Sequence, residues 1–262
     1  SPDQVFAALR NGFGLEECFR REMCSEEEFQ SQLRRCFRPS GPLRWPRVFG
    51  TKGLPTRLEV CSGTGDWVVA QAQAEAGKAN WVASELRYDR VHGIFAKAVL
   101  ARLENLCLLA GDAGSILEAS VPPGSLSHVC VNFPQPPQTT RNASCDEAES
   151  QLHLLTPEFF KAVHSALAQG GVLTIFSDNQ EYTRSLARTV GGLSGESGRL
   201  FAAFADVPNE HIEAAEEACG LLICPGCPGP EAGHAVRAES QFDRFFAHGR
   251  HVERWYVAAS KV

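Results

Sequence analysis

From Arg57 onward, short apolar runs alternate with longer amphipathic segments, and this alternation limits the fold more than any other feature of the chain. A short apolar run predicts a buried strand, and apolar residues repeating every 3.6 positions predict a helix. Strands that alternate with helices form a mostly parallel, doubly wound sheet, whose ligands bind at the carboxyl ends of the strands. The sequence therefore predicts an α/β fold of this kind. The expected strands are 57–61, 80–85, 105–111, 127–133, 172–177 and 254–260, and the expected helices are 66–77, 87–103, 157–169, 179–190 and 208–219.

The segments outside this alternation divide the chain. Residues 1–43 are rich in acids and arginines at helical spacing and predict a helical extension before a main domain at 44–262. Glycines and prolines at 39–55 are typical of a linker between the two. The glycine- and serine-rich stretch 191–198 predicts a flexible loop, and the proline- and glycine-rich stretch 224–233 predicts a turn.

Composition limits the partners of the protein. The chain has 262 residues and a formal charge of −6, so its overall charge gives no sign of nucleic-acid binding. A polyanionic partner would have to contact a local basic patch. Residues 34–47 form the one such cluster, and a charged linker explains it about equally well.

The compartment is expected to be intracellular and reducing. The chain has ten cysteines, most of them beside apolar residues, which is typical of buried thiols rather than a disulfide framework. No apolar stretch approaches the roughly 18–20 residues that span a membrane, so no membrane partner is expected.

Three strand ends carry groups suited to a nucleoside. The first expected strand leads into 59-EVCSGTGDW-67, where Gly63 and Gly65 allow a ligand to approach the backbone closely. The second ends at Glu85, which can accept the two hydroxyl groups of a ribose, and the third is followed by Asp112, which can accept from an adenine amine. The turn lacks the third glycine of a pyrophosphate-binding motif, which favours S-adenosyl-L-methionine (SAM) over NAD.

A metal site is not expected. Cys224 and Cys227 form a single CxxC pair with Cys219 and His234 nearby, but a zinc site usually needs a second pair of ligands at defined spacing.

Taken together in their order, the motifs closely resemble the tRNA (guanine-N7) methyltransferase family over roughly 44–190 and 240–258. This resemblance implies a SAM-dependent methyltransferase fold with a seven-stranded sheet, SAM as cofactor and tRNA as substrate. Asp178 matches an acid in the substrate pocket of the family, and Ser240, Phe242 and Asp243 match a substrate-binding block near the C-terminus. The positions that match the cofactor-binding residues of the family are Glu59, Gly63, Gly65, Glu85, Asp112 and Asn132.

The stretch 129-VCVNFPQPPQTTRN-142 departs from the family pattern. Gln135 stands where the family has its catalytic aspartate, so the resemblance implies that Gln135 and Asp178 are the catalytic pair. Arg141 alone remains from a basic run that would contact the substrate, and three acids follow it, at 146, 147 and 149. RNA affinity depends on neutralising phosphates with Lys and Arg, so this loop should bind RNA weakly.

Three functions remain open at this point. The first is a SAM-dependent methyltransferase acting on guanine N7, which carries a lone pair and needs no proton removed. The second is a catalytically inactive subunit that supports the structure or assembly of a ribonucleoprotein or other protein complex. The third is an active methyltransferase whose substrate is less anionic than tRNA.

Overall fold

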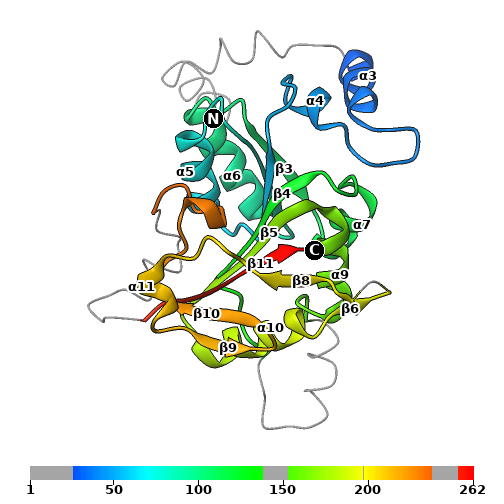
Figure 1. Cartoon of the computed structure of the whole chain (residues 1–262). Helices are drawn as coiled ribbons and strands as arrows, with labels where there is room; N and C mark the ends of the chain where they lie inside the picture. Colours follow the sequence, from blue (N-terminus) through cyan, green and yellow to red (C-terminus); the bar gives the residue numbers. More distant parts are fainter. Residues whose placement is uncertain (1–25, 138–152, 197, 238–252) are drawn as a thin grey trace, which may run out of the picture.

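A sheet of nine strands forms the centre of the computed structural model, which describes residues 26–137, 153–196, 198–237 and 253–262 (Figure 1). The strand order is β3-β2-β1-β4-β5-β11-β10-β9, and β8 pairs with β11. The first five strands are parallel, whereas β11 runs antiparallel to its neighbours. The strands are β1 (Thr56–Val60), β2 (Asn80–Glu85), β3 (Leu106–Ala110), β4 (Leu126–Asn132), β5 (Leu167–Ser177), β8 (Phe201–Ala203), β9 (Glu216–Ala218), β10 (Leu221–Pro225) and β11 (Trp255–Lys261).

Helices cover the sheet on both faces, because alternate residues of each strand point to opposite sides. On β4, Val129 and Val131 pack into one apolar cluster with α7, α9 and α10, whereas Cys130 packs into another with α5 and α6. The doubly wound α/β fold is therefore confirmed. The main helices are α5 (Asp66–Ala74), α6 (Tyr88–Leu100), α7 (Ala113–Ala119), α9 (Pro157–Ala166) and α10 (Gln180–Gly191).

Most expected elements before residue 191 are confirmed, and the strand expected at 254–260 is confirmed as β11, whereas the expectations for 191–233 were largely wrong. The helix expected at 208–219 is limited to α11 (Asn209–Ile212), and the chain then enters β9. The expected turn at 224–233 begins inside β10, and the expected loop at 191–198 contains a short antiparallel pair, β6 (Ser194–Gly195) with β7 (Gly198–Arg199). Strand β10 pairs with the distant strand β11, a contact that a local pattern does not reveal. Together with β8 and β9 it belongs to a sheet of nine strands, where seven were expected, whereas β6 and β7 form a separate pair.

The segment expected to be a linker is packed against the domain. Helix α3 (Glu26–Cys36) confirms the helical prediction for the described part of residues 1–43, and α4 (Trp45–Val48) follows it. Leu43, Trp45 and Phe49 are buried in the main core cluster. The division into a 1–43 extension and a 44–262 domain stays a prediction.

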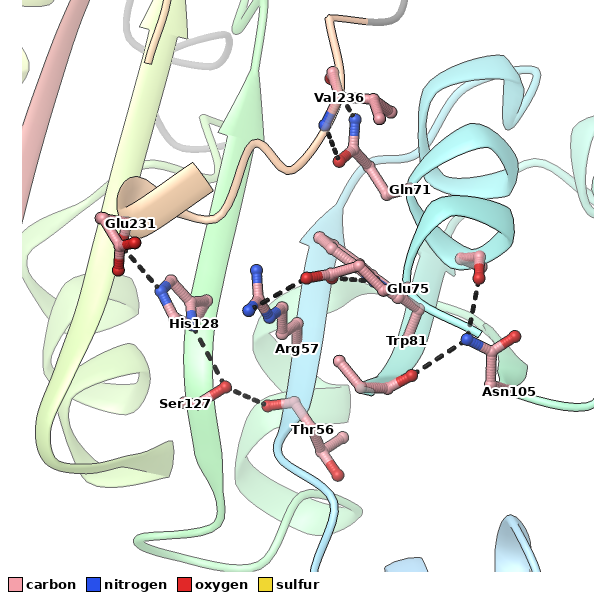
Figure 2. A network of polar contacts seen from close by, with 12 residues as sticks. Thr56, Arg57, Gln71, Glu75, Trp81, Asn105, Ser127, His128, Glu231 and Val236 are labelled. Carbon is pink, nitrogen blue, oxygen red and sulfur yellow. Dashed lines mark hydrogen bonds and ion pairs between the residues drawn. The ribbon is translucent and has the colours of Figure 1, made fainter. Parts of the chain in front are cut away.

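A polar network holds residues 229–236 across the sheet face that α5 and α6 share (Figure 2). The amide of Gln71 on α5 donates to the Val236 carbonyl (2.7 Å) and accepts from the Val236 N–H (3.1 Å). Thr174 on β5 donates to the carbonyl of Ala232 (2.6 Å), within the 3₁₀ helix η1 (Pro230–Ala232). Beside this segment, the buried pair Arg57–Glu75 (3.2 Å) is completed by the Trp81 indole N–H, which donates to Glu75 (2.9 Å).

Among the described residues, no helix combines the length and the apolar character needed to cross a membrane.

Two histidines in this region are held neutral by burial. Burial lowers the pKa of His128 to about 4 and that of His234 to about 3, from 6.5. The His234 ring lies 4.7 Å from Trp67 and 5.5 Å from Phe176, and its buried Nε2 has no hydrogen-bond partner among the described residues.

We therefore expect the free energy of unfolding to fall as the pH drops below 6.5. In that range the two histidines bind protons in the unfolded chain but stay neutral in the folded protein. For His234 alone the loss between pH 7.5 and 5 should be about 2 kcal/mol. His234→Phe keeps the aromatic contacts and should reduce this loss when urea unfolding is measured at both pH values. The exposed His92→Gln is the control, and equal pH dependence in both variants would contradict the assignment.

Candidate functional site

The turn from β1 into α5 follows a path that only small residues tolerate easily. Cys61, Gly63 and Gly65 have φ values of 55°, 57° and 77°, in the left-handed region. A Cβ atom on Gly65 would lie 2.5 Å from Cγ1 of Ile94 on α6, so glycine is required there by space as well as by conformation. The turn therefore brings backbone N–H groups to the carboxyl edge of the sheet.

Glu85 connects this turn to the end of β2. Its buried carboxylate accepts from the N–H of Gly63 (2.8 Å) and from the N–H of Arg87 (3.0 Å). Each oxygen keeps a further lone pair for another donor. Glu85 is thus fixed beside the glycine turn, and its contact with ribose hydroxyls stays a prediction.

The buried Glu59 and the half-buried Asn132 form a pair at the ends of the adjacent strands β1 and β4. Asn132 Nδ2 donates to Glu59 Oε1 (2.8 Å), while Glu59 Oε2 and Asn132 Oδ1 are buried without a hydrogen-bond partner among the described residues. Burial raises the pKa of Glu59 to about 7, with a smaller contribution from the negative charge of Glu85, while the hydrogen bond from Asn132 acts in the opposite direction. Two buried acceptors without donors indicate a site for a ligand with several N–H groups.

Asp112 follows β3 at the same edge of the sheet. It is the N-cap of α7, and its Oδ2 accepts from the N–H of Ser115 (2.8 Å). The residue is exposed. A carboxylate oxygen can accept more than one hydrogen bond, so capping leaves Asp112 able to contact a ligand.

Phe133 turns the chain sharply as it leaves β4. Its φ of 49° lies in the left-handed region, which is unusual for an aromatic residue and costs free energy. The conformation is held by its N–H, which donates to the Phe176 carbonyl (2.7 Å), and by the two rings, which meet edge to face at 5.0 Å. The guanidinium of Arg254 lies 5.3 Å from the centre of the Phe133 ring.

A pocket of about 480 Å³ lies between the segment after β4 and the first turn of α10. The structure thus brings Gln135 and Asp178 together, although 42 positions separate them in the chain. The lining consists of Phe133, Pro134, Gln135, Pro136, Asp178, Asn179, Gln180 and Glu181. It combines two carboxylates with three amides, and no Lys or Arg lines the pocket within the described part of the chain.

The sequence analysis missed a cluster that holds the wall of this pocket. Gln180 donates from Nε2 to Glu216 Oε1 (2.7 Å), and Arg184 donates to Glu216 Oε2 from Nε (2.9 Å) and Nη2 (2.6 Å). Glu216 lies on β9, where a helix had been expected, so no local signal pointed to this contact. The neighbouring Asn179 caps α10 by accepting from the N–H of Tyr182 (2.9 Å).

Several predicted residues lie outside the described part of the chain. They are Arg141, the three acids at 146, 147 and 149, and the block of Ser240, Phe242 and Asp243. Of the CxxC pair, Cys224 is buried in β10 and Cys227 is half-buried. Among the described residues, no three His, Cys, Asp or Glu side chains are grouped so that they could hold a metal ion.

The sequence of the chain matches a family model described as "Putative methyltransferase" over residues 54–194, more than half of its length. The chain belongs to this methyltransferase family. It is 35% identical over 138 residues to a tRNA (guanine-N(7)-)-methyltransferase of Chlamydia felis, covering 53% of this chain and 58% of the relative. It is 29% identical over 154 residues to the enzyme of the same name from Serratia proteamaculans, covering 59% and 61%.

These matches confirm the resemblance to tRNA (guanine-N7) methyltransferases, although the chain spans only a little over half the length of these curated relatives. Among solved structures, the protein PH0851 has a similar fold, with a TM-score of 0.51 at 13% identity, covering 82% of this chain and 44% of that one. The methyltransferase has the Rossmann-like fold of SAM-dependent methyltransferases, and its family implies SAM as the cofactor.

We expect Glu59→Gln to raise the stability of the ligand-free methyltransferase, although Glu59 is a candidate ligand-binding residue. The pKa of Glu59 rises from 4.5 to about 7 on folding, so the folded protein binds this proton more tightly than the unfolded chain does. The free energy of unfolding therefore falls as the pH rises from 4.5 to about 7. A neutral glutamine avoids that loss and should stabilise the ligand-free protein by up to about 3 kcal/mol at pH 8, but little at pH 5.

Urea unfolding at the two pH values measures this difference. Glu217→Gln, on an exposed neighbour of Glu216, is the matched control and should show no such pH-dependent gain. A Glu59→Gln protein that is less stable than the parent at pH 8 would contradict a raised pKa.

Proposed function

We propose that this methyltransferase transfers a methyl group from SAM to N7 of a guanine in tRNA. The observation that carries the proposal is the pocket lined by both Gln135 and Asp178. Asn132, which donates to the buried Glu59, directly precedes the first residue of the pocket lining in the chain. The names of the curated relatives support the choice of tRNA and of guanine N7.

The residues at the carboxyl edge fit SAM. Glu59 Oε2 and Asn132 Oδ1 are buried acceptors that an ammonium group, such as that of the methionine part, would satisfy. In the proposed complex, Glu85 would accept the ribose hydroxyls and Asp112 the adenine amine. The open space beside the backbone of Gly63 would admit the ligand. Bound SAM supplies an electrophilic methyl group carried on a positively charged sulfur.

The pocket fits a guanine that becomes positively charged. N7 attacks with its own lone pair, so the protein needs to orient the base rather than remove a proton. Methylation at N7 leaves a positive charge on the base, and the carboxylates of Asp178 and Glu181 on the pocket wall would stabilise it as it develops. The rigid prolines on either side of Gln135 hold the opposite wall in place.

Gln135 is the residue that should limit the rate. In the proposed role, its carbonyl oxygen accepts one hydrogen bond from the donor edge of guanine, where a carboxylate could accept two. A hydrogen bond to a neutral acceptor contributes about 1 kcal/mol, against about 1.5–3 for a charged one.

The proposal predicts that the purified protein binds SAM and methylates tRNA. Isothermal titration with SAM should give saturable binding, and incubation of an unmodified tRNA transcript with SAM should produce N7-methylguanine, detected by mass spectrometry of the nucleosides. Glu85→Ala should weaken SAM binding at least ten-fold, because it removes the acceptor fixed beside the glycine turn. Absence of SAM binding would exclude an active SAM-dependent enzyme. Binding without transfer to tRNA would favour a non-catalytic subunit or a methyltransferase with a different substrate.

A second prediction concerns Gln135→Asp. The restored carboxylate should raise kcat/KM for tRNA roughly five-fold, as expected for about 1 kcal/mol of added interaction in the transition state. Affinity for SAM should not change, since Gln135 lies on the pocket wall rather than beside Glu59. The matched control is Gln73→Asp on the exposed side of α5. An unchanged or lower rate would show that Gln135 is not the limiting group.

A further inference from the structure

A continuous stretch of the chain before β1 carries only positive charge. Between Glu28 and Glu59 there is no acidic residue, while the same stretch contains six arginines and one lysine. Arg57 is taken up in the buried pair with Glu75, and the other six cations are exposed. We call these six the basic surface: Arg34, Arg35, Arg38, Arg44, Arg47 and Lys52.

The basic surface stands out against the rest of the protein. The whole chain has a formal charge of −6, so without these six cations it would carry −12. Among the ion pairs formed by described residues, none involves a member of the basic surface. Within the described part of the chain, the positive charge of the basic surface is therefore not neutralised by ion pairs with acids.

The segment that carries the basic surface is built into the domain. Phe37 and Leu43 pair as an antiparallel bridge, and the Leu43 N–H donates to the carbonyl of Ser120 (2.8 Å). The indole N–H of Trp45 donates to Ser125 Oγ (2.9 Å), and the buried Trp45 and Phe49 rings lie 6.0 Å apart. A flexible charged linker would have no such anchors, so the fold holds the backbone of this segment in a defined place.

The anchors place the basic surface at the opposite end of the sheet from the pocket. Ser120 and Ser125 precede β4, whereas the pocket begins at Phe133, just after β4 ends. The seven residues of β4 separate the two ends by roughly 20 Å, at about 3.3 Å per residue. Figure 1 shows α3 and α4 at one end of the molecule and α10 and β9 at the other.

We propose that the basic surface binds the phosphate backbone of an RNA and forms a second contact, remote from the pocket. The pocket lining is acidic, so electrostatic attraction for a polyanion has to come from elsewhere. In other proteins, a double-stranded RNA-binding domain contacts an RNA helix over about 16 base pairs. An RNA of that length is long enough to contact both ends of the sheet of this protein. The proposal depends on the proposed function only for the identity of that RNA as tRNA.

The test is the salt dependence of RNA binding. Each phosphate contact contributes about 0.7–0.9 to the slope of log K against log salt. Arg38→Gln combined with Arg44→Gln should reduce that slope by about 1.4–1.8 for a fluorescent tRNA transcript, measured by anisotropy between 50 and 200 mM KCl. The matched control, Lys161→Gln with Arg188→Gln, removes two exposed cations on α9 and α10 and should leave the slope near that of the parent.

Three results would overturn the proposal: no RNA binding by the parent protein at 50 mM KCl, equal slopes for the two double variants, or a lowered thermal unfolding midpoint that accounts for the loss. Vesicles containing phosphatidylserine serve as a parallel probe. If Arg38→Gln/Arg44→Gln weakens binding to these vesicles and leaves RNA binding unchanged, the surface belongs to a membrane instead.

Methyl transfer is scored separately, so the two proposals can fail independently. A changed slope without formation of N7-methylguanine supports the basic surface and counts against the proposed activity. Formation of N7-methylguanine with equal slopes supports the activity and excludes this surface as an RNA contact.

Discussion

The parallel pairing of β1 with β2 and β4 is the constraint on which the rest of the site depends. In this register Val60 lies beside Ser84 and Val131, so all three strands end at one edge of the sheet. Glu59, Glu85 and Asn132 are therefore brought to the same edge by backbone hydrogen bonds alone. Glu59 is buried at this edge, and burial is the main cause of its raised pKa.

Backbone strain gathers at this same edge. Cys61 and Phe133 adopt left-handed conformations directly after β1 and β4, the two strands that supply the Glu59–Asn132 pair. Residues in such conformations persist only where the surrounding structure holds them, and they are frequent at ligand sites. Here the holding contacts are visible: the Phe176 carbonyl and ring fix Phe133, and Glu85 fixes the turn that follows Cys61. The strained backbone thus lowers the stability of the protein at the edge where a ligand would bind.

Charge is divided between the two ends of the molecule. The pocket end carries Asp178 and Glu181 and suits a base that becomes cationic, whereas the opposite end carries the basic surface and suits a polyanion. A protein whose net charge is negative can still bind RNA if its cations are concentrated in this way, because contacts with phosphates act locally under physiological salt.

Much of this could be predicted from the sequence because the signals are local. Hydrophobic periodicity located β1 to β5 and the helices α5, α6, α9 and α10, but not α7. The residues Gly63, Gly65, Glu85 and Asp112 located the carboxyl edge, since parallel strands must end together. Other features needed the tertiary structure because they join residues far apart in the chain. Strand β10 pairs with β11 and β9 pairs with β10, where a helix and a turn had been expected, and this pairing places Glu216 against Gln180. Burial of Leu43 and Trp45 likewise turned an expected linker into a fixed basic surface, because their anchors at Ser120 and Ser125 lie about 80 residues away. The sequence by itself therefore determined the fold class and the edge of the sheet at which the cofactor is proposed to bind. The tertiary structure decided the shape of the pocket and the placement of charge, because both depend on contacts between distant segments.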